Sequence, residues 1–244
     1  MSNFKSPNFN ERPDKASIDI IVMHYTGMKT AEAALKRMCD PEAQVSAHYM
    51  ICKNGDVINL VDESKRAWHA GISCWRGIAS LNDISIGIEM ENPGHEFGYE
   101  PFTEEQMVSV KKLAKDIIDR HGIEARNVVG HSDIAPSRKD DPGELFDWQG
   151  LAEEGIGLWH DVKKVWRGGD ILVEPGKEDV DVARVQKMLS DYGYHIRVDG
   201  YYGSKTEDVV KAFKRHFVPE QVNVYWDKLA EERMKKLLSM IGKV

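Results

Sequence analysis

The chain has 244 residues, a formal net charge of −7 and an isoelectric point near 5.7. This length accommodates one large domain, or a medium domain with a smaller one, and buries a substantial core. The negative charge argues against nucleic acid as the main partner, because phosphate backbones are bound by clustered Lys and Arg. No stretch approaches the roughly 18 consecutive apolar residues of a membrane-spanning helix, so we expect no transmembrane segment.

Two features of the sequence bear on the compartment. Residues 1–13 lack the apolar core of a secretory signal, which favours the cytoplasm. The periplasm or cell envelope is the alternative, if a targeting segment was removed. The three cysteines, Cys39, Cys52 and Cys74, are odd in number and form no C-x-x-C pair. This pattern speaks against a disulfide framework and a thiolate zinc site, so we expect reduced packing residues.

The N-terminal third predicts a strand, a helix and a hairpin, in that order. Ile18–His24 is a β-branched apolar run, which indicates a buried strand ending in a histidine. Apolar residues at helical spacing predict a helix over 30–39. The runs 47–52 and 57–61 flank an Asn-Gly pair at 54–55, which is typical of a tight hairpin turn with φ > 0 at both central residues.

The middle of the chain predicts a second strand, a long helix and a loop. In Ile84–Glu91 apolar residues alternate with small or acidic ones, which places Glu89 on the opposite face from the isoleucines. Thr103 and Gln106 form a capping box that opens an amphipathic helix ending near residue 122. The Pro- and Gly-punctuated stretch 129–143 has no helical or strand periodicity, so we expect a loop after a short strand.

A change of composition predicts a domain boundary in the last third. Residues there become rich in Gly, Pro and charge, which is typical of a linker. Beyond it we expect helices around 182–189 and 229–238, with a third between them that opens with a capping box at Ser204–Glu207. The predicted organisation is an α/β domain, a linker and a small all-α domain of three helices, at 1–166, 167–180 and 181–244.

Five residues that carry chemistry are expected near strand ends, where open α/β sheets build their sites. A catalytic zinc ion takes three protein ligands, imidazoles and carboxylates among them, and keeps a fourth position open. His24, His131 and Asp141 suit this role. Glu89 suits a general base, and Lys139 suits an oxyanion stabiliser. The alternative, in a chain with nine histidines, is that these are hydrogen-bonded core or surface residues.

The motifs, in their order, resemble a known family. They are Ile21–Thr26 (IVMHYT), Val45–Tyr49 (VSAHY), Ala67–Gly71 (AWHAG), Ser85–Glu89 (SIGIE) and Gly130–Gly143 (GHSDIAPSRKDDPG). This set is similar to the zinc-dependent N-acetylmuramoyl-L-alanine amidases of the AmpD and AmiD type. The resemblance implies a mixed central sheet flanked by helices, as in peptidoglycan recognition proteins, and one zinc ion per chain. It also implies hydrolysis of the amide between the lactyl group of N-acetylmuramic acid and L-alanine.

Carried over residue by residue, the resemblance makes His24, His131 and Asp141 the zinc ligands. It makes Glu89 the catalytic base and Lys139 the group that stabilises the oxyanion. Among more distant relatives, the phage lysozyme-like amidases and the animal peptidoglycan recognition proteins, those with activity have a tyrosine before the histidine of the second motif and a cysteine as third ligand. This chain has an alanine and Asp141 at those positions, so the bacterial branch is the better match.

Other residues near these motifs have open roles. Trp68 and His69 lie in a Gly-flanked loop and are candidate substrate-binding residues, with loop packing as the alternative. His48 alternates with apolar neighbours, which favours a hydrogen-bonded core histidine. His160 is expected on the surface, with closure over the site as the alternative. Glu91 is left without a role.

The C-terminal region resembles the three-helix peptidoglycan-binding domain that is often fused to wall hydrolases. The similarity covers roughly residues 178–240 and includes the Asp-Gly and Tyr-Gly turns before the second helix. It departs at Lys214, where the family usually has glutamine. A purely structural docking role for this region is therefore the alternative to glycan binding.

The sequence predicts a zinc amidase whose partner is peptidoglycan or its muropeptide fragments. The alternatives are a catalytically silent peptidoglycan-recognition module and a metallopeptidase that cuts within the stem peptide. The presence of all five site residues favours the amidase. The sequence leaves open whether 1,6-anhydro fragments or polymeric wall are preferred, and it leaves the oligomeric state unknown.

Overall fold

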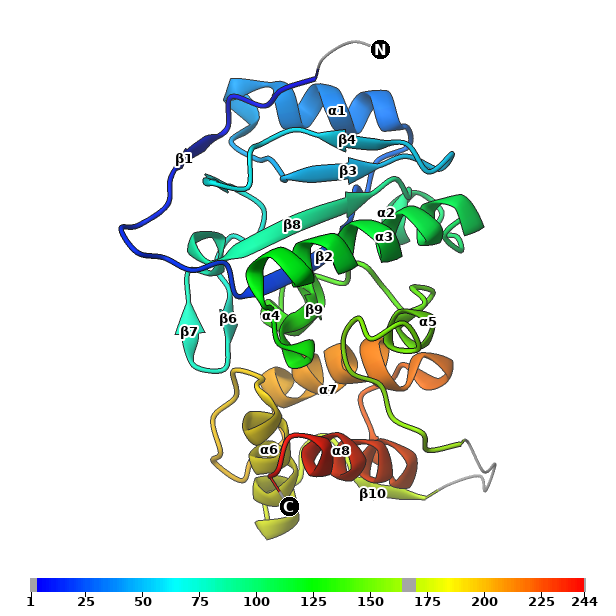
Figure 1. Ribbon diagram of the computed structural model, residues 1–244. Coiled ribbons are helices and arrows are strands. Elements are labelled where there is room, and N and C mark those ends of the chain that lie inside the picture. Colours follow the sequence, from blue (N-terminus) through cyan, green and yellow to red (C-terminus); the bar gives the residue numbers. More distant parts are fainter. Residues whose placement is uncertain (1–3, 164–169, 244) are drawn as a thin grey trace.

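Residues 4–163 and 170–243, described by a computed structural model, form an α/β body with a smaller module packed against it (Figure 1). The central sheet has five strands in the order β4-β3-β8-β2-β9. Their bounds are Tyr49–Ile51 for β3, Val57–Asn59 for β4, Ser85–Met90 for β8, Ile20–Tyr25 for β2 and Val128–Gly130 for β9. Strands β3, β8, β2 and β9 run parallel, and β4 runs antiparallel to β3. The predicted mixed sheet is confirmed.

Parallel pairing brings the carboxyl ends of β8, β2 and β9 to the same edge of the sheet. His24 in β2 is paired with Glu89 in β8. Met23 is paired with Gly130 in β9, so the next residue along, His131, continues the same row. Paired residues of neighbouring strands point to the same face. The register therefore places the side chains of Glu89, His24 and His131 next to one another on the same face of the sheet.

The long helix α3 (Glu104–His121) covers the opposite face of the sheet (Figure 1). Its buried residues pack against alternate residues of the inner strands, among them Ile21, Met23, Ile86 and Ile88. The predicted alternation along β8 is therefore confirmed, and Glu89 lies on the face away from α3. The capping box of Thr103 and Gln106 is also present.

Shorter elements complete the α/β body. The predicted helix over 30–39 is present as α1 (Ala31–Cys39), with Thr30 as its N-cap, and it packs against the β3–β4 edge. The other helices are α2 (Gly94–Phe97), α4 (His131–Ile134) and α5 (Trp148–Ala152). Two small antiparallel pairs lie outside the sheet: β1 (Phe9–Glu11) with β5 (Lys65–Ala67), and β6 (Cys74–Trp75) with β7 (Ile78–Ala79). Short 3₁₀ helices lie at Pro41–Ala43, Leu81–Asp83 and Ala125–Asn127, and a fourth, Pro219–Gln221, lies in the C-terminal module.

The predicted hairpin forms, but its turn is not the expected one. Strands β3 and β4 pair antiparallel, and in the loop between them Gly55 alone has a positive φ, at 82°. Asn54 instead accepts a hydrogen bond from the backbone N–H of Asp56, at 3.1 Å, which stabilises a longer loop. A side chain at position 55 would meet the carbonyl oxygen of Glu105 in α3 at 2.9 Å, so this turn requires glycine.

The C-terminal module contains the three predicted helices, α6 (Val180–Tyr192), α7 (Ser204–Phe217) and α8 (Lys228–Met240). It is not purely helical, because β10 (Ile171–Val173) pairs with β11 (Trp226–Asp227). The predicted linker, 167–180, therefore contains a strand that belongs to the module. This strand consists of the three apolar residues Ile171–Val173. The first part of that linker, 167–169, lies outside the described residues.

Two further expectations for this region are wrong. Helix α7 has Gly203 as its N-cap, without a side-chain hydrogen bond, so no capping box forms at Ser204–Glu207. His160 neither lies on the surface nor closes over the site. It is 4% exposed, and its Nε2–H donates to the carbonyl oxygen of Phe217 at 2.8 Å. The module packs over this segment, which periodicity along the chain does not indicate.

The hydrophobic core of the sheet continues into the module. Ile20 and Val22, on the face away from α3, belong to the same buried cluster as Phe213 of α7. Trp75 joins the two parts, because its ring lies edge-on to that of Tyr194 with centroids 5.3 Å apart. Helix α7 lies directly beside α4 in Figure 1. The two parts therefore form one packed unit.

The remaining sequence features concern membrane-spanning helices and the state of the three cysteines. Within 4–163 and 170–243, no helix has the length and apolar character to cross a membrane. The cysteines are unpaired and half-buried, as expected: Cys39, Cys52 and Cys74.

A buried ion pair inside the module gives a stability prediction. Lys214 is 0% exposed, forms an ion pair with Asp227 and donates to Asn223 at 2.8 Å. Burial lowers the pKa of Lys214, and Asp227 opposes this shift. Lys214→Met leaves the Asp227 carboxylate buried without its cation, so we expect a loss of about 3 to 5 kcal/mol of unfolding free energy in urea.

The matched control is Lys211→Met on the same helix. Its ion pair with Asp208 is partly exposed, so its removal should cost less than about 1 kcal/mol. Equal losses in the two variants would show that the buried pair does not stabilise the module as argued.

Candidate metal centre and active site

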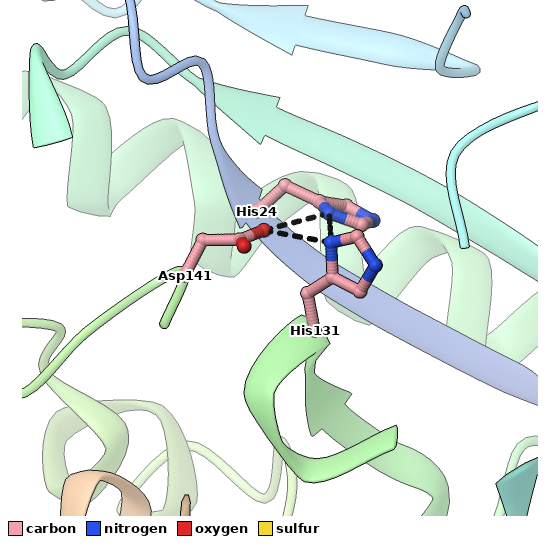
Figure 2. A group of neighbouring side chains, drawn as sticks. All are labelled: His24, His131 and Asp141. Carbon is pink, nitrogen blue, oxygen red and sulfur yellow. Dashed lines mark hydrogen bonds and ion pairs between the residues drawn. The ribbon is translucent and has the colours of Figure 1, made fainter. Parts of the chain in front are cut away.

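Three side chains converge at the carboxyl edge of the sheet (Figure 2). His24 comes from the end of β2, His131 from the start of α4, and Asp141 from the loop after α4. The Nδ1 atoms of the two histidines are 2.9 Å apart. Oδ2 of Asp141 lies 2.9 Å from Nδ1 of His24 and 3.0 Å from Nδ1 of His131. All three residues are at most 5% exposed. The predicted ligand set is thus one buried cluster that could hold a metal ion.

The segment that supplies two of these groups is not simply a loop. Residues His131–Ile134 form the single-turn helix α4 directly after β9, so the expectation of a loop here is wrong. After α4 the chain turns back towards the start of this helix, where the backbone N–H of Ser132 donates to the carbonyl oxygen of Asp141 at 2.9 Å. A side chain at Gly130 would meet Cδ of Pro142 at 2.8 Å, so glycine allows this close return.

Hydrogen bonds on the far side of each ring fix the tautomers of the two histidines. Nε2 of His131 lies 3.2 Å from the carbonyl oxygen of Ala70, which can only accept a hydrogen bond. Nε2 of His131 therefore carries the ring proton. Its Nδ1 consequently presents a lone pair towards the cluster.

For His24 the same result follows through a chain of three groups. Ser85 donates its hydroxyl to the carbonyl oxygen of Leu81 at 2.6 Å, so its oxygen accepts from Nε2–H of His69 at 3.1 Å. Nδ1 of His69 then accepts from Nε2–H of His24 at 3.0 Å. Nδ1 of His24 is left with a lone pair towards the cluster. Such partners behind metal-binding histidines orient the ring and fix its tautomer.

At neutral pH the histidines do not take up a second proton that would offset the repulsion among the facing lone pairs. Burial, followed by the neighbouring His131, lowers the pKa of His24 to about 4. Burial and the adjacent imidazoles also lower the pKa of His69 well below its usual value. Both rings are therefore neutral at pH 7.

The cluster fits a bound cation. Two nitrogen lone pairs and a carboxylate oxygen that face one another within about 3 Å repel each other unless a positive charge lies among them. A tetrahedral ion with ligand distances of about 2.0 to 2.1 Å holds its ligand atoms about 3.3 Å apart, close to the observed spacing. Imidazole and carboxylate donors suit zinc.

Glu89 lies beside this cluster, because it is the register partner of His24 on the neighbouring strand β8. The residue is half-buried, and its Oε2 atom is buried without a hydrogen-bond partner among the described residues. Burial raises the pKa of Glu89 well above its usual value, and Asp141 raises it further, while Lys139 opposes the shift. A carboxyl group with a raised pKa and a free oxygen can take up a proton.

A cavity of about 1040 Å³ opens over these groups. The five predicted site residues all line it: His24, Glu89, His131, Lys139 and Asp141. Further cationic residues also line it, among them Lys29 and Arg37 from other segments and Arg138 next to Lys139. The cavity is large enough for a ligand of several hundred cubic ångströms.

Two candidate substrate-binding residues have different positions. His69 lines the cavity but acts on His24, as described above. Trp68 is absent from the described lining, and its Nε1–H donates to Asn10 at 2.9 Å. A substrate contact by Trp68 therefore gains no support from its position and stays a prediction.

The role of His69 could not be derived from its own motif. The available signal was Gly87, the one glycine on the Glu89 face of β8. A Cβ atom there would lie 2.5 Å from the ring of His69, so glycine makes room for this histidine. His48 is a hydrogen-bonded core histidine, as expected. Its Nδ1 accepts from Gly87 N–H at 3.0 Å, its Nε2–H donates to Lys65 O at 3.1 Å, and burial lowers its pKa to about 4.

Sequence reasoning also missed a group of polar side chains that lines the cavity. The hydroxyl of Tyr25 lies 3.0 Å from Nδ1 of His95, whose Nε2 lies 3.2 Å from Glu144. Tyr25 and His95 line the cavity. No periodicity connects residues so far apart in the sequence. Glu91, which was left unassigned, accepts hydrogen bonds from the backbone N–H groups of Ala31 and Lys53.

Comparison with known proteins shows the family to which the chain belongs. A family model described as N-acetylmuramoyl-L-alanine amidase matches residues 14–144. The chain is 40% identical over 239 residues to the N-acetylmuramoyl-L-alanine amidase AmiD of Escherichia coli, covering 92% of this chain and 84% of that protein. The chain belongs to the N-acetylmuramoyl-L-alanine amidase family.

Solved structures extend the match to the whole amidase. E. coli AmiD in complex with the substrate anhydro-N-acetylmuramic acid-L-Ala-D-γ-Glu-L-Lys has a TM-score of 0.76 and 36% identity, covering 96% of this chain and 94% of that one. AmpDH3 from Pseudomonas aeruginosa in complex with anhydromuramic pentapeptide has a TM-score of 0.77 and 29% identity, covering 99% of both chains. A peptidoglycan binding domain model matches residues 178–223.

Because His69 holds Nε2–H of His24, we expect it to support metal binding at the cluster. His69→Phe keeps an aromatic ring but removes the acceptor for Nε2–H of His24. We expect about a 10- to 100-fold weaker affinity for zinc, measured by competition with a chromophoric chelator.

His95→Phe is the matched control, because His95 lines the same cavity but its ring nitrogens are directed to Tyr25 and Glu144, not to the cluster. Its zinc affinity should stay close to that of the unaltered chain. An unchanged affinity in the His69 variant would show that the hydrogen-bond chain does not orient His24.

Proposed function

We propose that the chain binds one zinc ion through His24, His131 and Asp141 and hydrolyses the amide between the lactyl group of N-acetylmuramic acid and L-alanine. The observation that carries this proposal is the convergence of two Nδ1 lone pairs and one carboxylate oxygen within 3.0 Å of each other. Membership of the amidase family supports the reaction, and the donor set supports the metal.

The residues around the cluster have separate tasks in this reaction. Zinc, when bound, supplies Lewis acidity that polarises a carbonyl and makes water more acidic. Glu89 takes the proton of the attacking water, because its free Oε2 and raised pKa suit a base that must later act as an acid. The ammonium of Lys139 stabilises the oxyanion that develops on the lactyl carbonyl. Glu89 then returns the proton to the departing alanine nitrogen.

The substrate proposal rests on the relatives and on charge. Two of the similar structures are complexes with anhydromuramic peptides. Muropeptides carry free carboxylates, and Lys29, Arg37 and Arg138 line the cavity. We infer that soluble anhydro-muropeptides enter this cavity, with polymeric wall as the second candidate. A catalytically silent recognition module would not need the buried, partnerless oxygen of Glu89.

We also propose the division of labour along the chain. Residues 1–166 form the catalytic domain, and 181–244, together with strand β10, form the peptidoglycan-binding-like module. The match of residues 178–223 to a peptidoglycan binding domain supports the second assignment. Glycan binding by the module is testable by pull-down of the full chain with purified sacculi.

The compartment we propose is the cytoplasm. The support is that Cys39, Cys52 and Cys74 are all unpaired, which suits a reducing environment. Cell fractionation tests this directly, and recovery of the protein with the envelope fraction would overturn it.

Glu89→Gln tests the proposed base. Glutamine keeps the shape but cannot accept the proton of water, so we expect kcat to fall at least about 100-fold while zinc affinity is retained. The unaltered enzyme should lose activity as the pH falls, because Glu89 must be ionised and its pKa is raised. The residual activity of the variant should lack this loss. Near-normal turnover in the variant would remove Glu89 as the base.

Asp141→Ala tests the proposed metal site. Loss of one of three ligands should weaken zinc binding by more than about 100-fold, measured by elemental analysis after dialysis and by chelator competition. Glu144→Ala, which removes a nearby carboxylate without contact to the cluster, is the control. Stoichiometric zinc in the Asp141 variant would contradict the ligand assignment.

The bond that is cut can be identified from the products. Mass spectrometry of a digested anhydro-muropeptide should show a free lactyl-bearing sugar and an intact peptide. Peptides cut internally would instead support the metallopeptidase alternative.

A further inference from the structure

Helix α4, which begins with His131, is held by the C-terminal module. Asp133, two residues after His131, is 1% exposed. Its Oδ1 accepts a hydrogen bond from the hydroxyl of Tyr194 at 2.7 Å, and its Oδ2 accepts from Nδ1–H of His216 at 2.7 Å. Tyr194 follows α6 and His216 lies in α7. Two of the groups that satisfy this buried carboxylate therefore come from the other part of the chain.

A helix of one turn does not fix its own orientation. α4 has only four residues, and its closing bond runs from Ala135 N–H to His131 O at 3.0 Å. Isolated helices of this length are unstable, so tertiary contacts must hold it in place. Within the α/β body, Asp133 has one polar partner among the described residues, the backbone N–H of Gly130 at 2.7 Å. The orientation of α4, and with it that of His131, is consequently set in part by the module.

The two anchoring side chains are rigidly held. The ring of His216 is stacked between Trp148 and Phe217, with both centroids 3.8 Å away. Tyr194 is 2% exposed and lies edge-on to Trp75. Aromatic packing of this kind leaves little freedom for either donor. The rigidly held donors of Tyr194 and His216 therefore fix the position of the Asp133 carboxylate.

The module also holds the other end of the same segment. Arg215, next to His216 in α7, forms an ion pair with Asp140 at 2.6 Å. Asp140 directly precedes Asp141. One turn of α7 thus contacts residues that lie one or two positions from two of the three proposed metal ligands.

We propose that Tyr194 and His216 are positioning residues of the metal site, acting through Asp133 on His131. This inference rests on the proposed zinc site and goes beyond the proposed function, because it gives the module a role in metal binding that does not require glycan recognition. The module is then a structural part of the active site rather than only a tethered binding domain.

Tyr194→Phe in the full chain tests the inference. It removes the hydroxyl that binds Asp133 and keeps the ring against Trp75. We expect about a 10-fold weaker zinc affinity by chelator competition, in the range seen when partners of metal ligands are removed. We also expect an altered absorption spectrum with cobalt in place of zinc, and recovery of kcat when zinc is in excess.

Tyr192→Phe is the matched control. Tyr192 is buried in the same aromatic cluster and lies edge-on to the same Trp75, but no hydrogen bond joins it to Asp133. Its zinc affinity and cobalt spectrum should match those of the unaltered chain. Each variant is first shown to be folded by its urea midpoint, and His216→Gln serves as the second test if Tyr194→Phe is too unstable.

The route through Asp133 is tested by a double-mutant cycle. Tyr194→Phe should cause no further loss of zinc affinity when Asp133 is already replaced by asparagine. Zinc affinity within twofold of the unaltered chain in both folded variants, Tyr194→Phe and His216→Gln, would overturn the inference. If the unaltered chain itself fails to bind zinc, the proposed function fails instead, so the two failures are distinguishable.

Discussion

The structure of the site depends on one constraint: two imidazole nitrogens and a carboxylate oxygen face one another in a buried space. The distances among Nδ1 of His24, Nδ1 of His131 and Oδ2 of Asp141 are 2.9 to 3.0 Å. Hydrogen bonds to Ala70 and His69 place the ring protons on the outer nitrogens. Because the lone pairs converge, the arrangement is favourable only around a cation.

The rest of the fold can be understood as support for that cluster. Parallel pairing of β8, β2 and β9 brings Glu89, His24 and His131 into one row, while α3 covers the opposite face. Asp141 needs a return of the chain after α4, and glycine at position 130 permits it. The C-terminal module then packs its aromatic core against the same strands and reaches the cluster through Asp133. The α/β body and the module therefore form one packed unit.

The sequence was sufficient where local patterns carry the information. Alternation along β8 predicted the face of Glu89, and the apolar run of β2 predicted that His24 ends a strand. It was insufficient where contacts join distant segments. The partnership of His69 with His24 spans 45 residues, and that of Asp133 with His216 spans 83. The same cause hid the burial of His160. Strand β10 was missed because its partner lies beyond α7.

The central claim is that His24 and His131 bind zinc through Nδ1, because their Nε2 atoms are held by hydrogen bonds to protein groups. Diffraction data collected at the zinc absorption edge, from crystals of the full chain grown with zinc, test it most directly. The account predicts one anomalous peak bonded to both Nδ1 atoms and to Asp141, with His69 and Ala70 in their present positions. A peak bonded to Nε2 of either histidine, or placed away from this cluster, would contradict it.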